Sequence, residues 1–315
     1  DPIDLALYKD RTVHKPLNYG VENGKHLSAQ VHTSRAATGY REWINDYDET
    51  AKKYYALITG VDAALGMIRQ SLDREGLADN TVIIFTSDNG YNSGSHGFGD
   101  KVLPYEEGSK SPLVIYDPRL PAKQSGKVCD AVTASVDMAA TIFALSGVPA
   151  PEGIDGENLL PLLTDPAAHV RDYLPLFNFW GTLSAQSLAI VTPERKYIHW
   201  FFAGDGMQPT DELFNLDADR LEMKNVAGER SYASQLATLQ KAYDAEVAAI
   251  ASKVVAGHGY ESYSKLFDRS LAWEQKVQLL NESDLKNSGL KGGSTKRKQK
   301  QSSKLDSTYA TDAIA

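Results

Sequence analysis

The chain has 315 residues, of which 42% are hydrophobic and 23% are charged, so it can bury a sizeable core as a soluble protein. Its formal net charge of −8 argues against a general nucleic-acid binder. The single cysteine, Cys129, excludes an intramolecular disulfide and a multi-cysteine zinc site. Because no apolar run approaches the ~20 residues that span a bilayer, we expect no membrane partner.

The first half of the chain predicts one long helix and two short strands. Residues 1 to about 50 are polar and irregular, and over 48–74 the apolar positions recur at helical spacing, with Gly76 as the stop. Residues 81–85 (TVIIF) predict a fully buried strand, and 113–116 a second one. A helix that feeds a buried strand predicts an α/β fold with a largely parallel sheet flanked by helices.

The second half predicts a different architecture. A helix over 136–146 ends at Gly147, and the Pro/Gly-rich stretch 149–163 crosses to a new part of the chain. There we expect a small antiparallel sheet with a packed helix. The predicted strands are 188–191, 196–202 and 212–216, and the helix is 232–254.

These patterns divide the chain into three parts. Residues 1–165 form an α/β domain, residues 166–284 form an α+β subdomain, and residues 285–315 form a basic tail. The tail carries four cations in a Ser/Gly/Gln background, which predicts disorder; contact with nucleic acid or an anionic polymer is the alternative. The four cations are Lys296, Arg297, Lys298 and Lys300.

The segment TSDNGYNSGSHGFGDKVLPYEEGSKSP, residues 86–112, directly follows the first predicted strand. In an open α/β sheet, ligands bind where the chain leaves the carboxyl ends of the strands. Asp88 and Asn89 could hold a metal ion there, although Asp-Asn-Gly is also a good turn and, taken alone, is better read as one. Such oxygen donors suit Ca²⁺, with Mg²⁺ less favoured, rather than zinc.

Three cationic or ionisable side chains share this segment. A lone His is usually structural and a lone Lys is usually solvated, but His96, Lys101 and Lys110 lie together in a Gly-rich segment that we expect to fold over the strand end. A metal ion, an ammonium and an imidazolium together attract an oxyanion.

Six stretches, in order over about residues 50–250, resemble the sulfatase family within the alkaline-phosphatase-like superfamily. They read DNTVIIFTSDNG, HGFGDK, YEEGSKSPLVIYDP, VTASVDMAATIFALSGVPAPEGIDGENLLPLL, RKYIHW and DELFNLDADRLEMKNVA. The resemblance implies a sulfatase-like α/β domain over 1–165. It also implies hydrolysis of sulfate esters, on a sulfated sugar or an aryl sulfate, through a formylglycine nucleophile and a calcium ion.

The resemblance also assigns roles to single residues. Asp88 and Asn89 match the family's second pair of calcium ligands, and Lys101 matches the lysine that contacts the sulfate group. His96 matches a histidine beside the sulfate or the leaving oxygen. Lys110 stands where the family often has Arg, and binds substrate or supports the loop through a neighbouring glutamate.

The formylglycine motif C/S-x-P-x-R does not occur in this sequence. The nearest echo, Ser34-Arg35 in HTSRAATG, we interpret as coincidence. The start DPIDLALYKD shows no initiator Met and no signal segment. We therefore expect the later part of a sulfatase, with apolar surface exposed, weak calcium binding and no activity alone. Because sulfatases are commonly exported, we expect a periplasmic or secreted location.

Two other functions stay open. One is a phosphodiesterase or phosphonate monoester hydrolase of the same superfamily, although such enzymes often carry His where this chain has Asn89. The other is a non-catalytic remnant or binding module. Five rings line a sugar or aryl subsite or belong to the core, and we favour the core. They are Phe177, Phe179, Trp180, His199 and Trp200.

Overall fold

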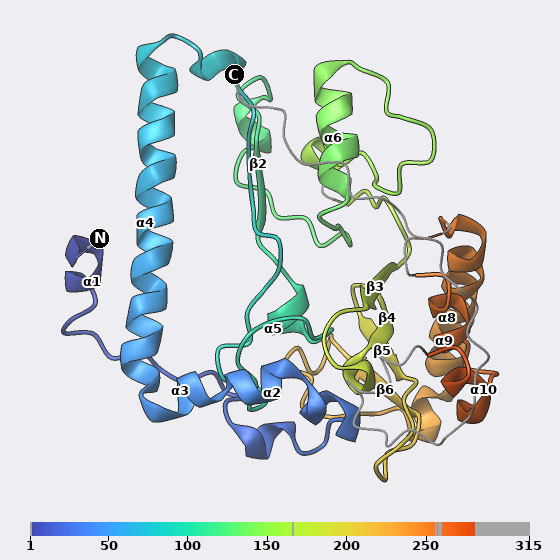
Figure 1. Ribbon diagram of the computed structural model, residues 1–315. Helices are drawn as coiled ribbons and strands as arrows, with labels where there is room; N and C mark the ends of the chain where they lie inside the picture. The colour runs from blue at the N-terminus through green and yellow to red at the C-terminus, as the bar shows by residue number, and fades with distance from the viewer. Residues whose placement is uncertain (1, 166, 256, 258–259, 281–315) are drawn as a thin grey trace, which may run out of the picture.

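The structure is a computed structural model that describes residues 2–165, 167–255, 257 and 260–280 (Figure 1). The predicted basic tail, 285–315, lies outside the described residues. Within the described part, no helix is both long and apolar enough to cross a membrane. The helices and strands are α1 (Pro2–Ala6), α2 (Arg35–Gly39), α3 (Arg41–Asn45), α4 (Tyr47–Arg74), β1 (Ile83–Thr86), α5 (Glu106–Ser109), β2 (Leu113–Tyr116), α6 (Asp137–Ser146), α7 (Leu160–Thr164), β3 (Leu174–Asn178), β4 (Ser187–Val191), β5 (Arg195–Trp200), β6 (Thr210–Asn215), α8 (Ala233–Lys253), α9 (Tyr263–Leu266) and α10 (Trp273–Val277).

The long helix α4 confirms the helical periodicity of residues 48–74. Its first turn is capped by the Asp46 carboxylate, which accepts a hydrogen bond from the Glu49 amide at 3.1 Å. The apolar side of the helix is nevertheless largely uncovered, because Leu57 is 70% exposed and Met67 is 63% exposed. The spacing therefore predicted the helix but not what its apolar side contacts.

The strands β1 and β2 form a two-stranded antiparallel ribbon, with Ile83 opposite Tyr116 and Thr86 opposite Leu113. The α/β class is confirmed, but the strands pairing in the described residues do so antiparallel, so the parallel sheet is not seen there. The expected full burial of 81–85 is also wrong: these residues are half-buried. In the described chain, β1 has β2 as its only strand neighbour, and one neighbour cannot shield both of its faces.

The second sheet, β3-β4-β5-β6, is an antiparallel meander with α8 packed on β4 and β5. The antiparallel sheet and its packed helix were predicted, but the strand β3 was not. Alternate residues of its strands point to opposite faces. On one face Leu188, Tyr197 and Leu213 pack with α8 in one core cluster. On the other face Ile198 and Phe214 belong to a second cluster. The sheet thus packs against a core cluster on each face, and it lies beside α8, α9 and α10, away from α4 (Figure 1).

The second core cluster joins the two halves of the chain. Its members from the first half include Leu27, Val31, Phe98 and Tyr105, and they pack on the sheet face opposite α8. Phe98 and Tyr105 lie within the segment 86–112 that the sequence singled out. The loop that carries the candidate site therefore lies directly on the C-terminal sheet, rather than being held by the first half alone.

The aromatic side chains of the second half divide into two groups. Trp200 and His199 are buried and Phe179 packs against the first cluster, which confirms the core interpretation for them. For Phe177 and Trp180 that interpretation is wrong, because they are 39% and 57% exposed. The reason is position: Phe177 lies on an outer strand of the sheet, and Trp180 lies in the turn that follows it.

A buried ion cluster fastens α5 to the sheet. The fully buried ammonium of Lys196 on β5 lies 2.7 Å from Glu106 Oε1 and 2.8 Å from Glu222 Oε1. The first contact is a hydrogen bond; the second is an ion pair without hydrogen-bond alignment. Glu222 Oε2 in turn accepts a hydrogen bond from the Glu106 amide at 2.8 Å.

A second buried carboxylate, Glu212 on β6, reinforces this attachment. Its Oε1 accepts a hydrogen bond from the Ser28 amide at 2.6 Å. Its Oε2 accepts hydrogen bonds from the Tyr105 hydroxyl at 2.9 Å and the Trp200 indole at 3.0 Å. A buried carboxylate with three donors is well solvated by the protein, so this group ties the N-terminal segment and the loop to one strand.

Burial and charge act against each other in the cluster. Burial alone would lower the pKa of Lys196, but the carboxylates of Glu222 and Glu106 raise it overall. Burial alone would raise the pKa of Glu106, but the Lys196 ammonium lowers it overall. For Glu222, burial prevails over Lys196 and raises the pKa to about 7. Lys196 and Glu106 thus stay charged near neutral pH, while Glu222 is close to half-protonated.

We predict that Lys196→Met lowers the free energy of unfolding by about 3 kcal/mol or more, because it leaves two buried carboxylates without their cation. Urea unfolding at pH 7 measures this loss. The matched control is Lys110→Met, because Lys110 pairs with the same Glu106 at 3.5 Å but is 68% exposed. That variant should change the free energy by less than about 0.5 kcal/mol. Equal losses in both variants would contradict the assignment.

A second prediction concerns pH. Since the pKa of Glu222 rises from 4.5 to about 7 on folding, the folded protein binds more protons than the unfolded chain between these values. Its contribution to stability is complete below pH ~4.5 and is lost as the pH rises through about 7.

Glu222→Gln cannot ionise, so its free energy of unfolding relative to the unmodified protein should increase between about pH 4.5 and 8, by an amount on the order of 3 kcal/mol. Urea unfolding of both proteins at several pH values measures the difference. A difference that is independent of pH would show that Glu222 keeps an ordinary pKa in the folded protein.

Candidate functional site

The segment 86–112 leaves β1 at its carboxyl end and returns to β2 through α5. Four non-glycine residues within it have left-handed backbone angles: φ is 48° at Ser93, 54° at His96, 62° at Asp100 and 79° at Val102. This conformation is costly for a residue with a Cβ, and most of all for β-branched Val102. A run of strained residues persists only where the surroundings impose it, and such runs gather at functional sites.

Glycine at position 90 places the start of this segment against α5. A Cβ there would lie 2.1 Å from the Glu107 carbonyl oxygen, so no other residue fits without moving the backbone. The Gly90 amide also donates a hydrogen bond to the Gly108 carbonyl at 3.2 Å. The close approach fixes Asp88 and Asn89 relative to α5, and thereby relative to the C-terminal sheet.

The structure places Asp88 and Lys101 close together. Lys101 Nζ lies 3.8 Å from Asp88 Oδ2, and both side chains reach solvent, with 45% and 79% exposed. Residues thirteen positions apart thus place an ammonium and a carboxylate at the same accessible point. Because both groups are exposed, each can bind a ligand. An exposed ion pair contributes little free energy, so replacing the Lys101–Asp88 contact by a ligand contact costs little.

The oxygen atoms at this point fit part of a calcium shell. The Asn89 side-chain amide donates to the Gly90 carbonyl at 2.8 Å, which leaves its own carbonyl oxygen as an acceptor. Asp88 Oδ1 accepts from the Asn89 amide at 2.9 Å, while Oδ2 faces Lys101. Hard oxygen donors of this kind suit Ca²⁺, which takes six to eight oxygens in total. Asp88 and Asn89 could therefore hold one side of the ion.

His96 lies in a different environment from Asp88 and Lys101. Its ring is fully buried, with Nδ1 3.0 Å from the Asn23 carbonyl and Nε2 3.1 Å from the Asn18 side-chain amide. Because a carbonyl only accepts, Nδ1 carries the proton and Nε2 accepts from Asn18. Burial lowers the pKa of His96, in agreement with a neutral ring. Both ring nitrogens therefore already have protein partners.

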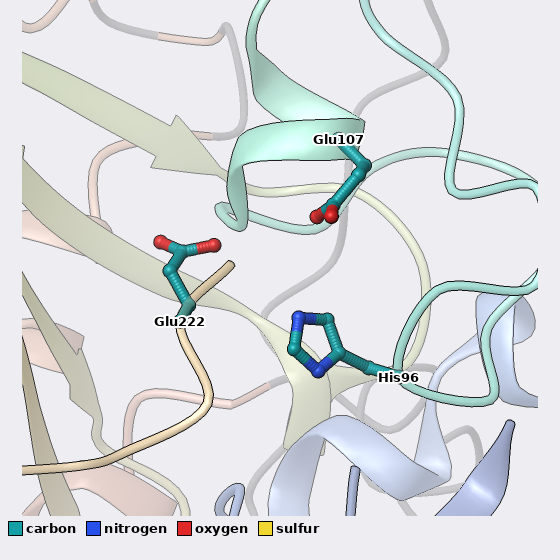
Figure 2. A group of neighbouring side chains, drawn as sticks. All are labelled: His96, Glu107 and Glu222. Carbon is teal, nitrogen blue, oxygen red and sulfur yellow. The ribbon is translucent and has the colours of Figure 1, made fainter. Parts of the chain in front are cut away.

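Figure 2 shows His96, Glu107 and Glu222 converging on one point, with one ligand atom of each within 4.8 Å of the others. The Asn18 amide, however, already donates to Glu107 Oε1 at 2.6 Å as well as lying beside His96. Glu222 faces the Lys196 ammonium. Within the described residues, Glu107 Oε2 and Glu222 Oε1 accept no hydrogen bond. Because both His96 nitrogens and Glu107 Oε1 already have protein partners and the Lys196 ammonium supplies positive charge, we interpret the group as a structural cluster that holds the loop.

Two further outcomes concern single residues. The exposed Lys110 pairs with Glu106, so it supports α5 in the way the sequence suggested as one of its roles. Lys196 and Glu222 were missed as functional candidates, although both lie in stretches that carried the family resemblance. The signal was a charged residue inside an apolar strand pattern, RKYIHW, which is costly unless the charge is paired.

Two family models match the chain in overlapping ranges. The model described as Sulfatase matches residues 14–148. The model described as N-sulphoglucosamine sulphohydrolase, C-terminal, matches residues 94–248. The two matches overlap over residues 94–148, which include Lys101 and α5. Both family models therefore cover the region where the two halves of the chain meet.

Curated relatives agree with these matches. The chain is 31% identical over 195 residues to an N-acetylglucosamine-6-O-sulfatase of Bacteroides thetaiotaomicron, covering 60% of this chain and 34% of that protein. It is 30% identical over 189 residues to an arylsulfatase of Clostridium perfringens, covering 60% of this chain and 38% of that protein. The chain thus spans little more than a third of the length of these relatives.

Solved structures show the same fold. One, in complex with its substrate D-glucosamine-2-N,6-O-disulfate, aligns with a TM-score of 0.64 and 22% identity over 80% of this chain and 63% of that chain. Another, a phosphonate monoester hydrolase of Agrobacterium radiobacter, aligns with a TM-score of 0.53 and 26% identity over 62% and 41%. From the family models, the relatives and the fold together, the chain belongs to the sulfatase family of the alkaline-phosphatase-like superfamily.

Proposed function

We propose that this chain supplies the sulfate-binding side of a sulfate-ester hydrolase. The observation that carries the proposal is the meeting of Lys101 and Asp88 at the end of β1, 3.8 Å apart and open to solvent, on a strained loop. At one accessible point, the carboxylate can bind a cation and the ammonium can bind an anion.

In this proposal, Lys101 binds a sulfate oxygen and offsets the negative charge that develops as the ester bond breaks. Asp88 and Asn89 hold a calcium ion, which when bound would polarise a sulfate oxygen. With its carboxylate directed at a cation, Asp88 would leave the Lys101 ammonium free for the substrate. The formylglycine nucleophile expected for the family has no C/S-x-P-x-R motif in these 315 residues.

His96 was expected beside the sulfate or the leaving oxygen. Its burial and its two hydrogen bonds support a positioning role instead, in which the neutral ring fixes the loop between Gly94 and Gly97 from beneath. A direct role toward the leaving group would require the ring to give up the Asn18 or Asn23 contact. We therefore place Lys101 in contact with substrate and His96 behind it.

The substrate in this proposal is a sulfated sugar. Two proteins similar to this chain support it: the N-acetylglucosamine-6-O-sulfatase by its name, and the solved structure by its bound disulfated glucosamine. The alternative reaction is phosphonate monoester hydrolysis, supported by the Agrobacterium structure. Asn89 favours sulfate, as argued from the sequence. A periplasmic or secreted location stays a prediction from the resemblance.

Without the nucleophile motif, we expect these 315 residues alone not to turn over an aryl sulfate in the presence of calcium. Activity is therefore tested in a full-length protein that carries this chain together with such a motif. There, Lys101→Ala should lower kcat/KM for a sulfated sugar by about 100-fold or more, since it removes a charge-assisted contact to the transition state.

The control for this experiment is Lys110→Ala, which removes an equally charged but more exposed lysine of the same segment. We expect its kcat/KM to stay within about threefold of the unmodified protein, because Lys110 contacts Glu106 at the surface. An unchanged kcat/KM in Lys101→Ala, or equal losses in the two variants, would refute the role given to Lys101.

A further inference from the structure

A small pocket lies beside Lys101, at the junction of the two halves of the chain. Its walls come from residues 34–36, 101–103 and 178–185. Inside, it has room for roughly one water-sized group, so a larger molecule would place one substituent in the pocket and lie across its mouth. Lys101 lines this pocket and also contacts Asp88, so the pocket adjoins the proposed sulfate site.

The mouth of the pocket carries a cation and a flat aromatic surface. The guanidinium carbon of Arg35 lies 5.7 Å from the centroid of the Trp180 ring, a cation–π distance. The Arg35 side chain is 67% exposed, and Trp180 is 57% exposed. Core packing explains the buried tryptophans Trp43 and Trp200. It does not explain Trp180, which is exposed beside an exposed arginine.

Asp100 orients the Arg35 side chain but engages only one edge of its guanidinium. Its Nε lies 3.0 Å from Asp100 Oδ2, and Asp100 immediately precedes Lys101. Across the described residues, Asp100 is the one acidic partner of Arg35, and this contact leaves the terminal amino groups of the guanidinium as donors. A guanidinium fixed along one edge is suited to bind the oxygens of a sulfate or carboxylate with the other.

The walls of the pocket are tied to one another. The Gly99 amide donates to the Ala36 carbonyl at 2.9 Å, which joins the Lys101 wall to the Arg35 wall. The Thr182 hydroxyl donates to the Thr33 carbonyl at 3.1 Å, which joins the Trp180 turn to the same wall. The site is therefore formed in advance of any ligand, and binding costs little ordering of the protein.

We propose that this mouth is a subsite for a sugar that bears a second anionic group. Trp180 stacks against the sugar ring, and Arg35 binds the second anion, while Lys101 binds the sulfate ester. The inference rests on the proposed function of Lys101 and adds to it a preference for doubly anionic sugars over singly sulfated ones.

The test measures binding of two probes to the 315-residue chain by tryptophan fluorescence and calorimetry. The probes are glucosamine-2-N,6-O-disulfate and N-acetylglucosamine 6-sulfate, which share one sulfate ester and differ in the second anion. We expect the disulfated sugar to bind more tightly. Arg35→Gln should weaken its binding by about tenfold, the value of one charge-assisted contact, and should leave the monosulfated sugar within about twofold.

Two further variants separate the ring from the charge. Trp180→Ala should weaken the binding of both sugars but leave the binding of inorganic sulfate unchanged. Trp180→Phe should retain most of the affinity for the sugars because it keeps a flat ring. The control for lost positive charge is Arg74→Gln. Arg74 lies at the end of α4 and its side chain is 70% exposed, so this variant should leave the affinity for both sugars unchanged. All of these side chains are largely exposed, so the variants are expected to fold.

The inference is overturned if Arg35→Gln weakens both sugars equally or neither, which would leave Arg35 as a structural partner of Asp100. It is also overturned if the disulfated sugar shows no saturable binding to the folded chain. Failure of the proposed function gives a different result, namely unchanged hydrolysis in the Lys101→Ala full-length protein. The two ideas can therefore fail separately.

Discussion

The structure depends on the buried ion pair between Lys196 and its two glutamates. The ammonium projects from β5, an inner strand of a sheet that packs against a core cluster on each face, and Glu106 comes from the other half of the chain. Burying these charges costs desolvation free energy, which offsets much of the attraction between them. What it supplies is register, because α5 can meet β5 in only one position if the charges are to be matched.

From this attachment the position of the candidate site follows. Once α5 is fixed, Gly90 brings the end of β1 against it, and the strained residues between Ser93 and Val102 are held in a conformation that they would not adopt alone. The neutral His96 ring fills the space beneath through Asn18 and Asn23. Rigid support of this kind leaves Lys101 and Asp88 at the surface with few alternative positions, which is what binding a small anion requires.

Periodicity and turn residues predicted α4, α6, the strands β4 to β6 and α8, because those signals are local. The family resemblance assigned Asp88 to a calcium ion and Lys101 to the sulfate, and the structure places the two side chains 3.8 Å apart. The sequence could not reveal that Glu106 and Lys196, 90 positions apart, belong to one buried ion cluster, since nothing local marks the partner of a buried charge. It also misjudged Trp180 and the burial of β1, because burial depends on which elements pack beside a residue and not on the residue's own hydrophobicity.

The central claim, that the loop after β1 is a site for a cation and a sulfate, is tested most directly by a crystal structure of this chain grown with calcium and sulfate at high concentration. The account predicts a calcium ion about 2.3 to 2.6 Å from oxygens of Asp88 and Asn89, and a sulfate within hydrogen-bond distance of Lys101 Nζ. Calcium bound among His96, Glu107 and Glu222 instead, with Lys101 still directed at Asp88, would contradict it.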